Sequence, residues 1–437
     1  MNILVICENF TKGGLETHIH SYYTALSREH RFIFAFGRFQ SELPFEQGNV
    51  YSDFSFSNTS SVGAFLQDVD RLIELIQDQN IDVIHVHPFY SIFPAMVASQ
   101  VAGVPIVCTH HGPASFTFPA RVSEMILFYY FYSEVVSKVF SVSRAGKNGL
   151  EDQMRMTNVT HLPNAVDTGL YRRHTVINNR RWAAVSRLDG DLGKVSALRK
   201  LFEAMPSLPI DAVDVYGDGS QRQALEEYVR ELGLERKVRF MGFQSDLYEH
   251  LDGNYNGIIG ADRVALEGLT MGYPVLELGY GRMCGVFDEA LLKLGGDCNF
   301  VAIDLPECKI DVLCRQLERV YSQPDCFDFR AYMMDAFDIH KVAADYVANL
   351  QKLSTHSLGN MRLFFEQMGD LPNKEVCIYE SIDLFWLMCR QIKPYAMDPK
   401  VQIMFQMGIE RIAAQSPTIQ AQALGSRMRQ KLKSWFK

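Results

Sequence analysis

The strongest constraint in this sequence is an alternation of short apolar segments with amphipathic segments. In residues 1–165, apolar segments such as Ile3–Cys7 and Val104–Thr109 alternate with segments such as Val62–Gln77, where apolar residues recur at every third or fourth position. Continuous apolar strands between helices are typical of a parallel sheet that is covered on both faces. We therefore expect an α/β domain over residues 1–165.

The same alternation restarts after residues 162–167, which read Leu-Pro-Asn-Ala-Val-Asp. Further apolar segments predict strands, with helices such as Ser220–Leu232 between them: Trp182–Val185, Ile210–Tyr216, Val238–Met241, Gly257–Ile259 and Pro274–Leu278. We expect a second parallel α/β domain over residues 166–353, joined to the first by this proline-containing linker. Ligands of such sheets bind beyond the carboxyl ends of the strands, so two facing domains would enclose a cleft.

Residues 354–437 are rich in methionine and carry few strand signals, so we expect a helical extension there. Its last part, Arg427–Lys437, is basic and amphipathic and contains Trp-Phe, which suits an anionic membrane surface. A solvated terminal helix is the alternative. The aromatic segment Met125–Tyr132 is too short to span a bilayer and predicts either a partly buried helix or a second surface contact.

Composition limits the possible classes of function. The formal net charge of −8 argues against nucleic-acid binding, because a phosphate backbone requires a basic face. The nine cysteines are an odd number without a Cys-x-x-Cys motif, which indicates reduced thiols. The N-terminus has no basic region or cleavage site and predicts a strand. We expect a cytoplasmic protein, with peripheral contact at the inner membrane face as a further hypothesis.

The stretch Gly260–Leu276 predicts a loop, a short helix and a buried strand. Asp262 has the residue type of an N-cap, whose carboxylate would accept from amides one turn further on. Gly272 fits the left-handed position after a last helical turn, and Pro274 prevents continuation of the helix. The segment therefore places the start of a helix at the carboxyl end of a predicted strand.

The start of this helix suits a nucleotide. The amides of Arg263, Val264 and the residue after them would form a donor-rich, positive end that favours a phosphate. Glu267 lies about one turn further along and could accept hydrogen bonds from a ribose diol. An ordinary capped helix with a solvated Glu267 is the alternative interpretation.

Two candidate ligand-binding elements follow predicted strands in the first half of the chain. Gly13 and Gly14 open a helix after the first strand, where they would let a ligand approach the backbone closely, although a plain tight turn also explains them. His111 follows the strand that ends at Thr109 and could donate to a sugar hydroxyl or a phosphate. A structural histidine is the alternative for His111.

The second half places cations at its strand ends. Arg187 and Lys194 could neutralise a diphosphate leaving group. Between them, residues 189–191 read Asp-Gly-Asp, which we interpret as a polar turn and not as a metal motif, because it lies beside the phosphate cations. Gly217 and Gly219 end another strand and would allow close approach of a ligand.

In combination and order, these motifs resemble those of glycosyltransferase family 4, whose members are retaining enzymes with the GT-B fold. The matching elements run from Met1 to about Leu353: Gly13-Gly14-x-Glu16, Thr109-x-His111-Gly112, Ser143-Arg144, Pro163-Asn164-Ala165-Val166-Asp167, Ser186-Arg187-Leu188 with Lys194, Gly217–Gly219, and Glu267–Val275. The resemblance implies two Rossmann-like domains that face an interdomain cleft, with the acceptor on the N-terminal side and the nucleotide sugar on the C-terminal side.

The resemblance also implies roles for single residues. Gly14 would approach the donor diphosphate, Arg187 and Lys194 would bind its phosphates, Glu267 would hold the ribose, the backbone near Phe243 would receive the base, and His111 would lie near the transferred sugar. It implies a UDP- or GDP-linked donor, no metal and no further cofactor. The expected acceptor is a glycan or lipid-linked saccharide in cell-surface polysaccharide or glycoconjugate synthesis.

Three departures from the family pattern matter. The family often carries a second glutamate at the position of Ile259, which cannot bind a sugar hydroxyl. Asp262 could substitute for it, although a helix cap explains Asp262 better, and residues 280–282 are another candidate for sugar contacts. Ala165 replaces a glycine, and the spacing from Arg187 to Lys194 is longer than usual.

These departures leave other functions open. One is a catalytically silent GT-B scaffold, which Ile259 and the methionine-rich extension motivate. Another is a GT-B nucleotide-sugar epimerase. A phosphorylase is disfavoured, because no convincing site for pyridoxal phosphate is visible in the sequence.

Overall fold

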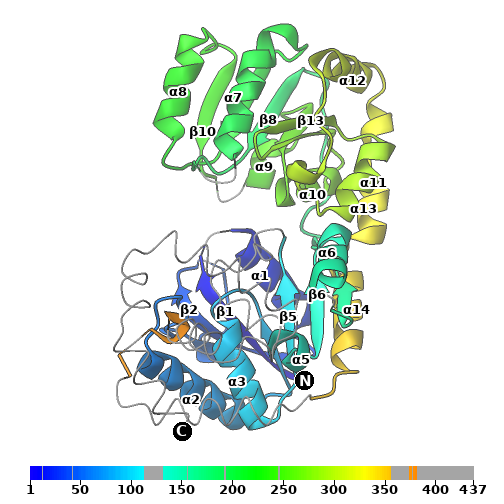
Figure 1. The fold of residues 1–437 in the computed structure, drawn as a ribbon. Coiled ribbons are helices and arrows are strands. Elements are labelled where there is room, and N and C mark those ends of the chain that lie inside the picture. Colours follow the sequence, from blue (N-terminus) through cyan, green and yellow to red (C-terminus); the bar gives the residue numbers. More distant parts are fainter. Residues whose placement is uncertain are drawn as a thin grey trace, which may run out of the picture.

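The computed structural model describes residues 1–11, 13–41, 43–112, 131–154, 156–190, 193–244, 247–355, 374–375 and 377–380. Within these ranges the chain forms two α/β domains, one above the other in Figure 1. The basic tail, most of the extension and most of the aromatic segment Met125–Tyr132 lie outside the described residues. No helix of the described part is both long enough and apolar enough to cross a bilayer.

The N-terminal domain is built on a parallel sheet with strand order β3-β2-β1-β4-β5-β6-β7. The strands are β1 (Asn2–Phe10), β2 (Arg31–Phe39), β3 (Val50–Tyr51), β4 (Val83–Val86), β5 (Ile106–His110), β6 (Lys138–Ser141) and β7 (Val159–His161). Alternate residues of each strand point to opposite faces. Leu4 and Ile84 therefore face one hydrophobic core, whereas Ile3 and Val83 face another.

Helices cover both faces of this sheet. The first core packs against α2 (Val62–Asp78) and α3 (Ile92–Ala102), and the second packs against α1 (Gly14–Leu26). The short α5 (Ser133–Val135) and α6 (Arg144–Met154) precede and follow β6. The start of α2 is fixed by Ser61, whose hydroxyl accepts from the Ala64 amide at 3.1 Å.

The C-terminal sheet has strand order β10-β9-β8-β11-β12-β13. Its strands are β8 (Arg181–Val185), β9 (Ala212–Tyr216), β10 (Val238–Gly242), β11 (Gly257–Gly260), β12 (Val275–Gly279) and β13 (Arg282–Val286). Helices α7 (Lys194–Ala204), α8 (Arg222–Glu231) and α12 (Ile310–Ser322) cover one face. The other face packs against α9 (Leu247–Leu251), α10 (Arg263–Thr270), α11 (Glu289–Asp297) and α13 (Arg330–Ala336).

The two predicted sheets with helices on both faces are confirmed, and with them the GT-B type of architecture. One strand departs from the expected parallel order, because β13 runs antiparallel to β12. The turn between them contains Tyr280 and Gly281 with φ of 53° and 71°. Left-handed residues at both central positions are typical of a tight hairpin turn. Residues 280 and 281 thus form the turn, and Arg282 begins β13.

The chain crosses between the domains twice, at neighbouring places. Val166 accepts from the Ile339 amide at 3.0 Å and donates to the carbonyl of Phe337 at 2.9 Å. The Thr168 hydroxyl adds a bond to the Asp338 carboxylate at 2.5 Å. The outgoing and returning crossings are therefore hydrogen-bonded to each other.

After the second crossing, the chain returns to the N-terminal domain. Helix α14 (Ile339–Leu350) packs against α1, and its Tyr346 is buried in the core on that face. Ile378 and Tyr379 are buried in the core on the other face. The predicted boundary of the second domain at residue 353 stays a prediction, although α14 in front of it contributes to the N-terminal core.

Candidate functional site

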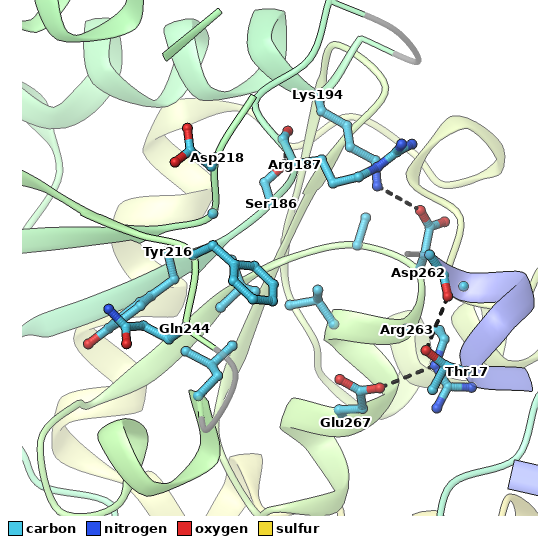
Figure 2. A pocket seen from close by; sticks show the side chains of 18 of the residues that line it. Thr17, Ser186, Arg187, Lys194, Tyr216, Asp218, Gln244, Asp262, Arg263 and Glu267 are labelled. Carbon is cyan, nitrogen blue, oxygen red and sulfur yellow. Dashed lines mark hydrogen bonds and ion pairs between the residues drawn. The ribbon is translucent and has the colours of Figure 1, made fainter. Parts of the chain in front are cut away.

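A cavity of about 820 Å³ lies between the two domains. The N-terminal domain contributes residues from the end of β1 and the start of α1, among them Asn9, Gly13, Gly14 and Thr17. The C-terminal domain contributes residues that follow its strands, which Figure 2 shows around the cavity: Ser186, Arg187, Lys194, Tyr216, Asp218, Gln244, Asp262, Arg263 and Glu267. The site therefore occupies the position expected for ligands of two facing parallel sheets.

The N-terminal wall is the start of α1. Gly14 is the first residue of the helix, and the Gly13 carbonyl accepts from both the amide and the hydroxyl of Thr17 at 3.1 Å. A β-carbon at Gly14 would lie 3.8 Å from Cδ of Arg263, on the opposite domain. The two glycines thus leave the backbone amides of a helix start beside the cavity, as a phosphate site requires.

The cation Lys194 is the first residue of α7, and Arg187 lines the same cavity. The preceding Gly193 has a φ of 63°, and a β-carbon there would lie 2.8 Å from the backbone of Tyr280. Glycine is therefore required to bring the start of α7 against the β12–β13 turn. The Nζ atom of Lys194 lies 3.5 Å from Oδ2 of Asp262.

Asp262 does not act as the predicted side-chain cap. Its backbone has φ 58° and ψ −129°, and its carboxylate accepts no capping bond from α10 within the described structure. This backbone conformation is rare for residues other than glycine and turns the side chain away from the helix amides. The carboxylate lines the cavity beside Lys194, and the hydroxyl of Tyr280 lies 3.5 Å away. The interpretation of Asp262 as a cap was wrong.

Burial raises the pKa of Asp262, and the neighbouring Lys194 ammonium opposes that rise. Its side chain is 25% exposed, so the carboxylate can reach a ligand in the cavity. Asp262 and Lys194 therefore form a partly desolvated ion pair on the wall of the cavity.

Glu267 lies one turn into α10 and pairs with Arg263, whose Nε atom is 3.2 Å from its Oε1. Burial raises the pKa of Glu267, and the Arg263 guanidinium opposes the rise. A second guanidinium nitrogen of Arg263 donates to the carbonyl of Ala165 in the linker at 3.3 Å. Figure 2 shows the pair of Arg263 and Glu267. Arg263 therefore connects the predicted ribose carboxylate with the segment that joins the domains.

The opposite end of the cavity suits a base. Tyr216 and Gln244 line it there, away from Asp262 and Arg263 (Figure 2). The half-exposed Phe243, next to Gln244 in the chain, also lines the cavity. Gly217 also lines the cavity, whereas a β-carbon at Gly219 would lie 2.4 Å from the backbone of Leu188. Gly219 is thus needed for packing between two loops.

Ile259 lies in β11 and is 1% exposed within the hydrophobic core. The strand therefore offers no polar side chain at the place where the family pattern has a glutamate. Val264, in the first turn of α10, does line the cavity. The carboxylates that line the cavity near Val264 belong to Asp262 and Glu267.

His111 takes part in a cluster of histidines behind the N-terminal wall. Its Nε2 lies 2.8 Å from Nδ1 of His87, and its ring meets that of His18 edge to face at 4.7 Å. Burial lowers the pKa of His111, and the nearby rings of His18 and His110 lower it further. His111 is thus a neutral ring that packs against His18, and it is not among the described residues that line the cavity.

The sequence motifs did not predict that His85 and His87 belong to this cluster. His85 and His87 alternate at the carboxyl end of a strand, a signal that could have been noticed. The Asp189 carboxylate accepts from the amide and hydroxyl of Ser220, at 3.0 and 3.1 Å, which agrees with the predicted polar turn. Among the described residues, no group of three or more His, Cys, Asp or Glu side chains is arranged for a metal ion.

Comparison with known proteins agrees with this geometry. The sequence model of the family described as "Glycosyltransferase Family 4" matches residues 12–170. The chain is a family 4-like glycosyltransferase with the GT-B fold. The match to the family model covers the Gly-Gly loop, the His111 element, Ser143-Arg144 and the linker, which are the motifs that the sequence shares with the family in its first half.

Two curated glycosyltransferase relatives are each 24% identical to this chain. The 2-deoxystreptamine N-acetyl-D-glucosaminyltransferase of Niallia circulans matches over 65% of this chain and 80% of its own length. The N-acetyl-alpha-D-glucosaminyl L-malate synthase of Bacillus anthracis matches over 60% and 76%. The crystal structure of Anabaena HepE in complex with UDP superposes with a TM-score of 0.59 at 17% identity, over 81% of this chain and all of that one.

Proposed function

We propose that this glycosyltransferase moves a sugar from a UDP- or GDP-linked donor to a glycan or lipid-linked saccharide, with retention of configuration and without a metal. The observation that carries the proposal is the convergence of Arg187, Lys194 and Glu267 on one interdomain cavity. These side chains have the chemistry to hold two phosphates and a ribose. The relatives support a sugar nucleotide as the first class of ligand to test, and UDP as the first nucleotide.

The arrangement supports an order of groups along the cavity. The base would lie between Tyr216 and Gln244, the ribose at Glu267, and the diphosphate between Lys194, Arg187 and the start of α1. The transferred sugar would then lie beyond the phosphates, near Asp262. Preorganised cations at the diphosphate stabilise the negative charge that develops as the sugar leaves.

In this proposal, Asp262 is the residue that determines which donor sugar is accepted. Its carboxylate stands next to the phosphate cation Lys194 and does not cap its own helix. A carboxylate accepts hydrogen bonds from sugar hydroxyls and repels a second carboxylate. We therefore propose an uncharged donor sugar, such as a hexose or N-acetylhexosamine, and not a uronic acid.

Retention is proposed with the acceptor hydroxyl arriving from the N-terminal side, on the face that the diphosphate leaves. The departing phosphate would take the acceptor proton.

The acceptor class, a role in cell-surface polysaccharide or glycoconjugate synthesis and contact with an anionic membrane are proposals that rest on the sequence. Removal of residues 427–437 should reduce sedimentation with anionic liposomes and leave donor hydrolysis intact; unchanged sedimentation would contradict the membrane role.

The first test is calorimetry with UDP, GDP and their sugar conjugates on the wild type and on Glu267→Ala. Binding of one diphosphate nucleotide that is lost in the variant supports the proposal. Donor turnover in the presence of candidate acceptors, followed by NMR of the product anomer and repeated with EDTA, then tests transfer, retention and metal independence. Absence of binding to every nucleotide would favour the scaffold hypothesis instead.

A further inference from the structure

The ion pair of Arg263 and Glu267 is more enclosed than the neighbouring pair of Lys194 and Asp262. The side chains of the first pair are 11% and 19% exposed, compared with 19% and 25% for the second. Arg263 and Glu267 both line the cavity. Nε of Arg263 lies 3.2 Å from Oε1 of Glu267 (Figure 2). Helix α10 therefore holds a cation directly beside the carboxylate to which the proposed function assigns the ribose.

Arg263 is also contacted by the linker and by the N-terminal domain. Its Nη1 donates to the carbonyl of Ala165 at 3.3 Å, and Ala165 is itself buried. The aliphatic part of Arg263 faces the start of α1, because a β-carbon at Gly14 would lie 3.8 Å from its Cδ. The guanidinium is therefore held in its place beside Glu267 by three separate segments of the chain.

Packing alone does not account for this arginine. Its Nη2 is buried and has no hydrogen-bond partner among the described residues. An unpaired buried donor costs free energy, and an apolar side chain of similar length would avoid that cost. A charged residue at this position is therefore better explained by the effect of its charge on Glu267 than by its contribution to stability.

The charge of Arg263 acts on the ionisation of Glu267. Burial raises the pKa of Glu267, whereas the Arg263 guanidinium and a hydrogen bond from Tyr171 lower it. Tyr248 also faces the carboxylate, and its hydroxyl lies 2.8 Å from that of Tyr171. Burial raises the pKa values of both tyrosines, so they are neutral at neutral pH, as is the buried His18 near Arg263. Within the described structure, Arg263 is thus the cation that opposes protonation of Glu267.

We propose that Arg263 is a positioning residue, which keeps the Glu267 carboxylate ionised and oriented for the ribose diol of the nucleotide. This inference rests on the proposed function, which assigns the ribose to Glu267. An ionised carboxylate accepts hydrogen bonds from two hydroxyls, whereas a protonated carboxyl carries a hydrogen of its own and is a weaker acceptor. Ribose recognition should therefore become dependent on pH once the cation is removed.

The test measures ribose recognition as a ratio of affinities. Calorimetry from about pH 6 to about pH 9 gives the affinity for UDP divided by that for 2′,3′-dideoxy-UDP, or for the GDP pair should the wild type prefer GDP. Both ligands carry the same base and diphosphate, so their own titrations and any direct phosphate contact of Arg263 cancel in the ratio. In the wild type the ratio should be roughly tenfold or more, and it should change by less than about twofold over this range.

Arg263→Met removes the charge and keeps an unbranched side chain. Its ratio should fall about fivefold or more at the acidic end and recover toward the wild-type value at the basic end, because Glu267 then takes up a proton at a higher pH. Arg263→Lys keeps a positive charge beside the carboxylate, so its ratio should stay within about threefold of the wild type throughout. The matched control is Arg315→Met, which removes an exposed pair of the same i,i+4 spacing with Asp311 on α12 and should match the wild type.

A ratio for Arg263→Met that does not depend on pH would overturn the inference, whether it equals the wild-type ratio or is lower by a constant factor. The constant factor would indicate a structural role that leaves the ionisation of Glu267 unchanged. Arg263→Gln, which is neutral and polar, repeats the test should the methionine variant not fold. A wild type that binds but does not discriminate the ribose would overturn the inference as well, whereas a wild type that binds no nucleoside diphosphate would overturn the proposed function.

Discussion

The two walls of the cleft are built on similar sheets but differ in charge. The C-terminal wall presents ion pairs, Lys194 with Asp262 and Arg263 with Glu267. The N-terminal wall presents a helix start, behind which lie neutral histidines that burial prevents from being protonated. A diphosphate needs fixed charges, whereas an uncharged sugar needs oriented dipoles. Under the proposed function, the charged wall would hold the diphosphate and the neutral wall would face the sugar.

The largest expected effect is on the charged wall, in Lys194→Ala. Loss of the ammonium leaves the diphosphate with Arg187 as its remaining proposed cation and removes the ion-pair partner of Asp262, so kcat/KM for the donor should fall by about 100-fold or more. Lys200→Ala is the matched control, because Lys200 lies on the same helix in an exposed pair with Glu307. Comparable rates for the two variants would show that the charged wall does not bind the diphosphate.

Glu267→Gln tests the ribose contact on the same wall. Hydrogen bonds to a charged acceptor are stronger than neutral ones, so affinity for the nucleoside diphosphate should fall by roughly 10- to 100-fold. Calorimetry with a 2′,3′-dideoxy nucleotide sharpens the test: the wild type should bind it less tightly, and the variant should no longer discriminate. Glu226→Gln on the surface of α8 should behave as the wild type does. Discrimination that persists in Glu267→Gln would place the ribose elsewhere.

Asp262→Asn separates the sugar from the phosphates. The variant should keep its affinity for the free diphosphate nucleotide, because Lys194 loses a competing partner, while sugar transfer should fall about tenfold. The variant should also gain measurable turnover of a uronic acid-linked donor, since the repelling carboxylate is gone. Asp189→Asn, in the polar turn nearby, serves as the control. Equal use of neutral and acidic donors by the wild type would contradict the role of Asp262.

Acidification should distinguish the two domains by stability. The folded pKa values of His18 and His85 lie below the unfolded value of about 6.5, so the unfolded chain binds protons first as the pH falls. Each such histidine should cost the N-terminal domain up to about 1.4 kcal/mol per pH unit below that value. The buried carboxyls Asp262 and Glu277 act in the opposite sense: their folded pKa values are raised, so their stabilisation is present at low pH and is lost as the pH rises.

Hydrogen exchange at pH 7 and pH 5 measures this difference by domain. Peptides of β4 and β5 should lose protection at pH 5 before peptides of β11 and β12 do. His85→Gln, which keeps the bond to Thr109, should reduce the acid sensitivity, whereas His250→Asn on α9 should not. Equal loss of protection in both domains would contradict the predicted difference in acid stability between them.

The smallest effect is expected inside the C-terminal domain, at Glu277. The residue is fully buried on β12, and neither carboxylate oxygen has a hydrogen-bond partner among the described residues. Glu277→Met replaces it with an apolar side chain of similar length and should raise the free energy of unfolding at pH 8 by about 1–3 kcal/mol. Thermal unfolding measures the gain, with the exposed Glu227→Met as the control. Destabilisation would indicate a hidden polar contact at Glu277.

The fold was predictable because its signals are local. Apolar segments at regular intervals predicted most strands of both sheets, although not the short β3 and β7, and the proline-containing linker predicted the break between the domains. Helix α14 was placed with the second domain, because sequence order does not reveal which sheet a helix covers after the chain has crossed back. Strand β13 was missed because Tyr280 adopts a left-handed conformation, which its residue type does not favour.

The site was predictable as a set of residues but not as a set of contacts. Arg187, Lys194 and Glu267 line one cavity, as expected from their places after strands. The residue type of Asp262 favoured a cap, but its unusual backbone angles direct the carboxylate to Lys194. The histidine cluster depends on the register between β4 and β5, which no single segment encodes. Contacts that join distant segments therefore required the structure.

The paired crossings at Val166 and Asp338 have a mechanical consequence. Two chain segments that are hydrogen-bonded side by side behave as a strap and not as a single swivel. Such a two-stranded connection bends perpendicular to its plane more easily than it twists or stretches. It therefore favours a hinge motion in which the two domains open and close about a single axis. The two domains would then close with the same relative orientation each time. The start of α1 would therefore return to the same position over the proposed phosphate site.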